Sequence, residues 1–149
     1  MRTVRDDSGR RYVLVKRSSE SSLVRDPESG EKRYVDNDRL EPAEGMGALE
    51  TAASAVSPAV RKVVSATHDD HTLGLLVELV DRDGVAVRDL LADYDLCESD
   101  LLGVLTEFRA AGLVTEARIA GERGYAPTDT AREGIAAMRH ADAKTETDD

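Results

Sequence analysis

The sequence predicts an α+β protein in which a small N-terminal antiparallel β-meander is followed by a helical domain that carries a β-hairpin. Over 1–41, short runs with a period of two residues alternate with turn residues. Over 70–111, apolar residues recur three, four and seven positions apart, as in helices that pack on a core. After Gly112 the period returns to two, which predicts the hairpin.

The N-terminal part, 1–41, is predicted to form three or four short strands. The clearest one is 11–17, because its central residues, 12–15, are mostly β-branched or aromatic. Turn residues at 6–9, 18–21 and 26–30 separate it from the other expected strands, which span 2–5, 22–25 and 31–35. A sheet this small is marginally stable alone, so we expect it to pack on the rest of the chain or on a second subunit.

Residues 42–69 are predicted to form a linker and a short helix. Ser57 is a favoured N-cap and Pro58 suits the first helical position, which predicts a helix over 58–66. Val60, Val63 and Val64 would lie on one side of it, and this narrow stripe needs a partner surface.

Residues 70–140 are predicted to form the main domain. Asp70 can cap a first helix that ends before Asp83-Gly84, with an inner stripe formed by Leu73, Leu76, Val77 and Val80. After a short extended link at Val85, a second helix of about two turns carries Val87, Leu90 and Leu91 and ends near 94–95. A third helix spans 98–111 with Leu101, Val104, Leu105 and Phe108 facing inward. The tight turn between the second and third helices predicts a helix-turn-helix.

A hairpin and a last helix complete this domain. Residues 113–119 are predicted to form a strand, and 125–127 a short return strand after a glycine-flanked turn, so the hairpin would be a wing. Thr128 or Asp129 would cap the last helix, whose inner side would carry Ala131, Ile135 and Met138. The acidic tail, 141–149, has nothing to bury and is expected to be disordered.

Two stretches of this domain resemble winged helix-turn-helix regulators of the MarR and ArsR kind. Residues 105–114 (LTEFRAAGLV) are similar to the end of the recognition helix and the entry to the wing, and 124–132 (GYAPTDTAR) to the return strand and following helix. The resemblance covers about 70–140. It implies a DNA-binding transcriptional regulator or chromatin-associated protein that acts as a homodimer on double-stranded DNA. The β-rich N-terminal extension resembles that of uncharacterised haloarchaeal proteins.

The candidate DNA-binding residues lie on the third helix, the second helix and the wing. Helical spacing places Ser99, Gly103 and Thr106 opposite the inner face of helix 98–111, and Leu102 and Ala110 lie nearby. Positive charge is supplied by four arginines. The predicted site is therefore Arg88, Ser99, Gly103, Thr106, Arg109, Arg118 and Arg123.

A protein-interaction role is the alternative. Residues 71–139 carry 7 basic and 13 acidic residues, and phosphates repel acidic side chains. A winged helix without sequence-specific DNA binding would instead present this surface to a protein partner, either basic or acidic. The homodimer is expected to form through helix 58–66 and the last helix, whose apolar stripes have no evident partner in the sequence.

Composition limits the other classes of protein to which the chain could belong. The 149 residues include 30 acidic and 20 basic side chains, and 42–149 carries a net charge of −11. Arg (16) far exceeds Lys (4) and Asp (17) exceeds Glu (13), which resembles halophilic archaeal proteins. One Cys excludes an internal disulfide, and the sequence shows neither a signal peptide nor a long apolar run. We therefore expect a cytoplasmic protein that is not an enzyme, needs no cofactor or metal, and does not span a membrane.

Three further groups of residues have a composition that could form a site. His68-Asp69-Asp70-His71 has the composition of a divalent-metal site, although a polar connector with a helix cap is favoured. Cys97 is expected to be a partly buried thiol at a helix start, with its pKa raised by Glu98 and Asp100, and a redox-sensing role is the alternative.

The third group is a basic patch in the meander, interleaved with Tyr12 or Tyr34, that would contact nucleic acid or the acidic second part of the chain. Strand alternation divides these residues between two faces, so scattered solvated charge is the favoured interpretation. The basic residues are Arg10, Arg11, Lys16, Arg17, Arg25, Lys32, Arg33 and Arg39.

Overall fold

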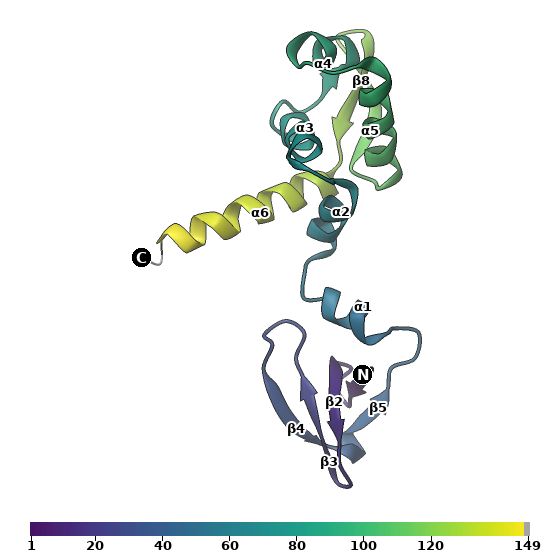
Figure 1. The fold of residues 1–149 in the computed structure, drawn as a ribbon, viewed down its shortest axis with the longest axis vertical. Coiled ribbons are helices and arrows are strands. Elements are labelled where there is room, and N and C mark those ends of the chain that lie inside the picture. Colours follow the sequence, from purple (N-terminus) through teal and green to yellow (C-terminus); the bar gives the residue numbers. More distant parts are fainter. Residues whose placement is uncertain (148–149) are drawn as a thin grey trace. The chain divides into compact units, whose positions relative to one another are not determined.

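The computed structural model describes the backbone of residues 1–147 and the side chains of residues 1–140. The chain divides into two compact units, Met1–Val56 and Ser57–Asp149 (Figure 1). The predicted α+β class and N-terminal antiparallel sheet are confirmed. The division differs from the predicted boundaries, because 42–56 belongs to the first unit and 57–69 to the second.

The first unit is built on a five-stranded antiparallel sheet with the strand order β4-β3-β2-β1-β5. Its strands are β1 (Arg2–Asp6), β2 (Arg11–Arg17), β3 (Ser21–Arg25), β4 (Lys32–Asp36) and β5 (Leu40–Pro42), with the short helix η1 (Asn37–Arg39) before β5. The sequence does not predict β5, because a strand that contains Pro has a weak signal. Pro42 is tolerated because β5 lies at the sheet edge, opposite Val4 of β1.

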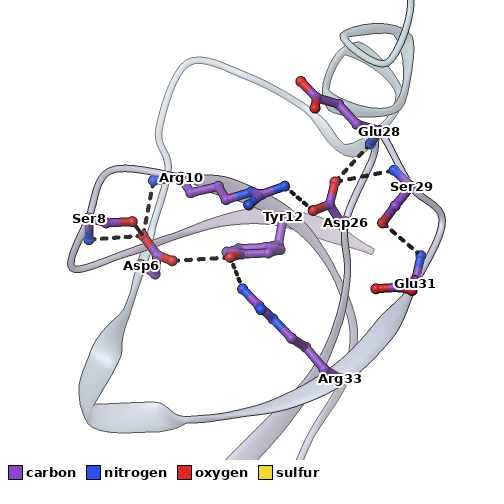
Figure 2. A network of polar contacts seen from close by, with 9 residues as sticks. All are labelled: Asp6, Ser8, Arg10, Tyr12, Asp26, Glu28, Ser29, Glu31 and Arg33. Carbon is purple, nitrogen blue, oxygen red and sulfur yellow. Dashed lines mark hydrogen bonds and ion pairs between the residues drawn. The ribbon is translucent and has the colours of Figure 1, made fainter.

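A buried tyrosine forms the centre of this small unit. Tyr12 packs with Val4, Val24 and Val35, and its hydroxyl lies 3.1 Å from a carboxylate oxygen of Asp6. Figure 2 shows that the guanidinium groups of Arg10 and Arg33 also contact this network. Their central carbons lie 5.9 and 5.1 Å from the ring centroid. Both arginines are exposed, and each contacts the ring of the buried tyrosine.

The segment predicted to be the start of a linker instead folds against the sheet. Helix α1 (Ala48–Ala53) contacts β1 and β2, and its Thr51 is buried. The hydroxyls of Thr3 and Thr51 lie 2.5 Å apart, and Thr3 also donates to the carbonyl of Gly47 at 2.9 Å. These contacts fix 47–53 to the outer face of β1 and β2.

The second unit combines five helices with a three-stranded antiparallel sheet of order β6-β8-β7. In chain order the elements are α2 (Pro58–Ala66), α3 (Asp70–Asp81), β6 (Val85–Ala86), α4 (Val87–Asp93), α5 (Glu98–Ala110), β7 (Val114–Ile119), β8 (Glu122–Pro127) and α6 (Asp129–Thr147). The side chains of Leu76, Leu79, Leu90 and Phe108 are fully buried in one core.

Local signals place most of these elements correctly. Ser57 accepts a hydrogen bond from the Val60 amide at 3.3 Å, as expected of an N-cap, and the Thr128 hydroxyl accepts one from Ala131. In α3 the cap is Asp69 rather than Asp70, because Thr72 completes a reciprocal capping box with it. Strand β8 begins at Glu122, three residues before the predicted return strand.

The inner face of α3 differs from the predicted stripe. Leu75, Leu76 and Leu79 are buried, whereas Leu73, Val77 and Val80 lie partly exposed at the margin of the core. Six of the eight residues from 73 to 80 are apolar. Spacing alone therefore does not locate the centre of so broad an apolar face.

Helices α2 and α6 pack against each other, which corrects the prediction that their apolar stripes lack a partner within the chain. Ala59, Val63 and Ala66 are buried on α2, whereas Val64, expected on the same side, is 57% exposed. On α6, a Cβ atom at Gly134 would lie 2.7 Å from Val63 Cγ2, so the contact requires glycine.

The backbone of α6 continues as helix over 141–147, within the segment that the sequence predicts to be disordered. Asp148 and Asp149, the end of that predicted acidic tail, lie outside the described residues. Among the described residues, the structure has no helix with both the length and the apolar character needed to cross a membrane.

Candidate nucleic-acid interface

Helix α5 presents the predicted groove-facing residues at its surface. Leu101, Leu105 and Phe108 are buried, so the opposite side, with Ser99, Gly103 and Thr106, is exposed. No atom lies within 4 Å of the position that a Cβ at Gly103 would occupy, so this surface is open. The Thr106 hydroxyl donates to the Leu102 carbonyl at 2.7 Å, which leaves its oxygen able to accept.

The hairpin of β7 and β8 carries two of the predicted arginines. Arg118 and Arg123 lie directly opposite each other across the two strands. The turn between them uses positive φ at Ala120 (51°) and Gly121 (84°), and Arg118 donates to the Gly121 carbonyl at 3.0 Å. The Arg118 guanidinium is thereby held at the turn of the hairpin, whereas that of Arg123 contacts Tyr125 and Glu116, farther from the turn.

A glycine positions this hairpin on the rest of the unit. A Cβ atom at Gly124 would lie 2.6 Å from the Val85 carbonyl oxygen and 2.7 Å from Ile119 Cγ1. Strand β8 can therefore approach β6 this closely only without a side chain at this position. The close approach places the hairpin beside α4, which follows β6 directly.

Glu116 on β7 connects two of the arginines. One of its carboxylate oxygens lies 3.2 Å from Arg109 of α5 and 3.5 Å from Arg123 of β8. Arg123 also donates to the Tyr125 hydroxyl at 3.2 Å, and these neighbours raise the pKa of its guanidinium, Tyr125 most strongly. A hollow of about 390 Å³ beside this group is lined by Glu116, Ala117, Arg118 and Arg123.

The fourth arginine reaches the hairpin from another helix. Arg88 of α4 lies 3.3 Å from the carboxylate of Glu122, the first residue of β8. The four predicted arginines therefore lie at the hairpin but on two faces, because Arg88 meets Glu122 on the face opposite Arg118 and Arg123. The sequence does not predict the carboxylates that pair with Arg88, Arg109 and Arg123, because Glu116 and Glu122 meet these arginines only through the strand register and helix packing.

Acidic side chains dominate the exposed surface of α5 itself. Glu98, Asp100 and Glu107 are exposed there, and Glu107 lies 3.4 Å from His68 Nε2. Arg109 is the only basic residue of this helix. Basic side chains are thus more numerous on the hairpin beside α5 than on α5 itself.

Cys97 differs from the prediction in both exposure and acidity. The thiol is exposed rather than partly buried. Its pKa is lowered, not raised, because the Ser99 hydroxyl, 3.2 Å from Sγ, and the backbone amides of Asp100 and Ser99 stabilise the thiolate more than the Asp100 charge opposes it. Neighbouring charges alone do not predict the pKa of a thiol at a helix start, because backbone amides also point toward the side chain there.

His68 and His71, the candidate metal ligands, have different surroundings. Asp69 caps α3, and the Thr72 amide and hydroxyl lower its pKa. His68 contacts Glu107, whereas His71 borders a separate hollow of about 450 Å³ with Glu78 and Tyr94. Within the described part of the chain, no three His, Cys, Asp or Glu side chains form a group that could hold a metal ion. Asp69 is thus the helix cap that the polar-connector interpretation expects, one residue before the predicted cap.

Comparison with known proteins assigns the chain to a family. It belongs to the family of unknown function DUF7346, whose model matches residues 1–139 and so includes both units. No curated protein sequence and no solved structure matches the chain.

Proposed function

We propose that the second unit is a winged helix and that the chain is a cytoplasmic DNA-binding protein, either a transcriptional regulator or a chromatin-associated protein. In this proposal α4 and α5 form the helix-turn-helix, and β7 with β8 forms the wing. The order of the elements and the short connection of residues 94–97 support it. The role is one of binding and not of catalysis.

The gathering of Arg88, Arg109, Arg118 and Arg123 around the hairpin carries the proposal. Arg118 and Arg123 lie opposite each other on this hairpin, and such a pair suits contacts with adjacent phosphates or entry into the minor groove. The exposed Ser99, Gly103 and Thr106 allow α5 to approach the major groove closely, but they offer little base discrimination. We therefore expect DNA binding that depends on phosphate contacts and DNA shape more than on base sequence.

Homodimerisation is part of the proposal, but only part of the surface that the sequence predicts is available for it. The stripes of α2 and α6 pack on each other within the chain. The exposed Val64 lies outside the buried stripe of Ala59, Val63 and Ala66 on α2, and it is the apolar contact we assign to the dimer. Sedimentation equilibrium of the wild type and Val64→Ser tests it, since a dimer that is equally stable in both contradicts this surface.

A protein-interaction module is the second candidate. The acidic exposed side of α5 favours it, because Glu98, Asp100 and Glu107 would repel phosphates and attract a basic partner. Under this alternative Arg88, Arg109 and Arg123 would keep their carboxylate partners and duplex DNA would not bind.

Titration of a labelled mixed-sequence duplex separates the two candidates. We expect the full chain to bind, and simultaneous Arg118→Glu and Arg123→Glu to weaken binding on every duplex to a similar extent. The matched control carries Arg17→Glu and Lys62→Glu, which change the net charge equally at exposed positions outside the hairpin. Unchanged affinity of the hairpin variant at matched salt would refute the proposal.

A further inference from the structure

The outer face of the first unit's sheet has a surface that the proposed DNA-binding unit does not use. Val24 and Val35 face the core, so strand alternation places Leu23, Arg25 and Tyr34 on the opposite face. Tyr34 is 65% exposed, whereas the other tyrosine of this unit, Tyr12, is buried.

A β-bulge brings a lysine to the same face. In β2 the register shifts between Leu14 and Lys16, so that Leu14 lies opposite Val24 but Lys16 lies opposite Leu23. Without the extra residue, Lys16 would share the inner face with Leu14. The bulge thus turns Lys16 outward and Arg17 inward, a change of face that strand alternation from the sequence does not predict.

These side chains form a compact surface across three strands. Lys16, Leu23 and Tyr34 lie side by side in one row, because Leu23 is opposite both Lys16 and Tyr34. Arg25 and Lys32 form the adjacent row. We call this set of five residues the Tyr34 face. Asp36 of β4 lies on the same side of its strand as Lys32 and Tyr34.

The positive charges of the Tyr34 face do not stabilise the sheet. Arg25 and Lys32 lie directly opposite each other, and like charges in this position destabilise a strand pair. Elsewhere in this unit Arg5, Arg10 and Arg39 each pair with a carboxylate. Within the described residues, Lys16, Arg25 and Lys32 have no such ion pair. An anionic ligand would relieve this repulsion.

We propose that the Tyr34 face binds single-stranded nucleic acid. An exposed aromatic ring can stack on an unpaired base, the neighbouring Leu23 extends the apolar contact, and the lysines and arginine around them can contact the charged backbone. A duplex hides its bases from such a ring, and an acidic peptide has no flat surface to stack on it. This proposal does not depend on the winged-helix proposal for the second unit.

Fluorescence anisotropy with labelled strands of about 12 thymidines or uridines, using the full chain, tests the proposal. We expect Tyr34→Ala to weaken binding by about tenfold and Tyr34→Phe to retain it, because stacking requires the ring and not the hydroxyl. Lys16→Glu should weaken binding as well. Arg17→Glu is the matched control, since it is the next residue of the same strand, is exposed, and faces the other way.

Other outcomes would overturn the proposal. Equal affinity of the wild type and Tyr34→Ala would exclude stacking, and equal losses from Lys16→Glu and Arg17→Glu would indicate unspecific charge. Binding of a polyglutamate peptide as tight as that of the thymidine strand would indicate an acidic protein partner instead. The variant with Arg118→Glu and Arg123→Glu should keep its single-strand affinity, so a failure of either proposal is recognised separately. Tyr34 is exposed, and thermal melting verifies that the variants fold.

Discussion

Arg123 on β8 lies 3.5 Å from the carboxylate of Glu116 on β7, and Arg109 approaches the same oxygen from α5. All three side chains are substantially exposed, and ion pairs of this kind contribute only about 0–1 kcal/mol. The arginines can therefore exchange Glu116 for a phosphate at little cost. In the absence of DNA, Glu116 holds them in place and reduces the positive potential of the hairpin.

Removing this carboxylate is expected to strengthen DNA binding. Glu116→Gln keeps the size of the side chain but leaves Arg109 and Arg123 without their anionic neighbour. We expect the affinity for a duplex to rise several-fold at low salt. Glu133→Gln, an equal charge change at an exposed position of α6, serves as the control in the same anisotropy titration. A decrease, or the same small gain in both variants, would contradict this role of Glu116.

The packing of α2 on α6 should be sensitive to one methyl group. Gly134→Ala places a Cβ 2.7 Å from Val63 Cγ2 and 2.8 Å from the Ala59 carbonyl oxygen, so it should lower the free energy of unfolding by about 1–3 kcal/mol. Gly103→Ala on α5 adds a methyl group in open space. It should raise the free energy of unfolding by about 0.5–1 kcal/mol, because glycine is a poor helix former. Urea unfolding followed by circular dichroism measures both, and equal effects would be inconsistent with the observed helix contact.

The first unit should lose stability in acid through Asp6. The Ser8 hydroxyl above all, with the Arg10 amide and the Tyr12 hydroxyl, lowers the pKa of Asp6 from 3.8 to about 2. Between these two values the unfolded chain binds more protons than the folded chain, so the free energy of unfolding falls as the pH decreases from about 4 to about 2.

Two measurements check this behaviour of Asp6. Asp6→Asn should show less of the acid-dependent loss than the wild type, since the amide does not titrate. An NMR titration of the Asp6 carboxyl group measures the pKa directly. A value near 4 would contradict the hydrogen-bond network of Figure 2.

Cys97 should react faster than an ordinary exposed thiol at neutral pH. The Ser99 hydroxyl is the largest cause of its lowered pKa. Ser99→Ala should therefore raise that pKa and slow alkylation by iodoacetamide, whereas Ser99→Thr, which keeps a hydroxyl, should react like the wild type. The rate is followed against pH. Identical pH profiles for all three proteins would show that the hydroxyl does not act on the thiol.

The sequence predicts those elements whose signals are local. Ser57, Gly112 and the stripe of Leu101, Leu105 and Phe108 define their helices without help from distant residues, and the structure confirms each of them. The elements that it misses depend on tertiary contacts. Strand β5 exists because β1 offers it an edge, and α1 is held by the hydroxyl contact between Thr3 and Thr51.

The sequence likewise predicts only the part of the candidate site that depends on local signals. Helical periodicity is sufficient to place Ser99, Gly103 and Thr106 on the exposed side of α5. Nothing in the sequence pairs Arg88 with Glu122, residues that are 34 positions apart. The alternation of side chains along a strand likewise does not predict the bulge in β2, which determines the face on which Lys16 lies.

The salt dependence of duplex binding tests the central claim most directly. Each phosphate contact contributes about 0.9 to the slope of log affinity against log salt concentration. We predict that simultaneous Arg118→Ala and Arg123→Ala reduces this slope by about 2 relative to the wild type, on duplexes of unrelated sequence. An unchanged slope, or no duplex binding by the wild type at low salt, would contradict the assignment of the hairpin as a DNA-contacting wing.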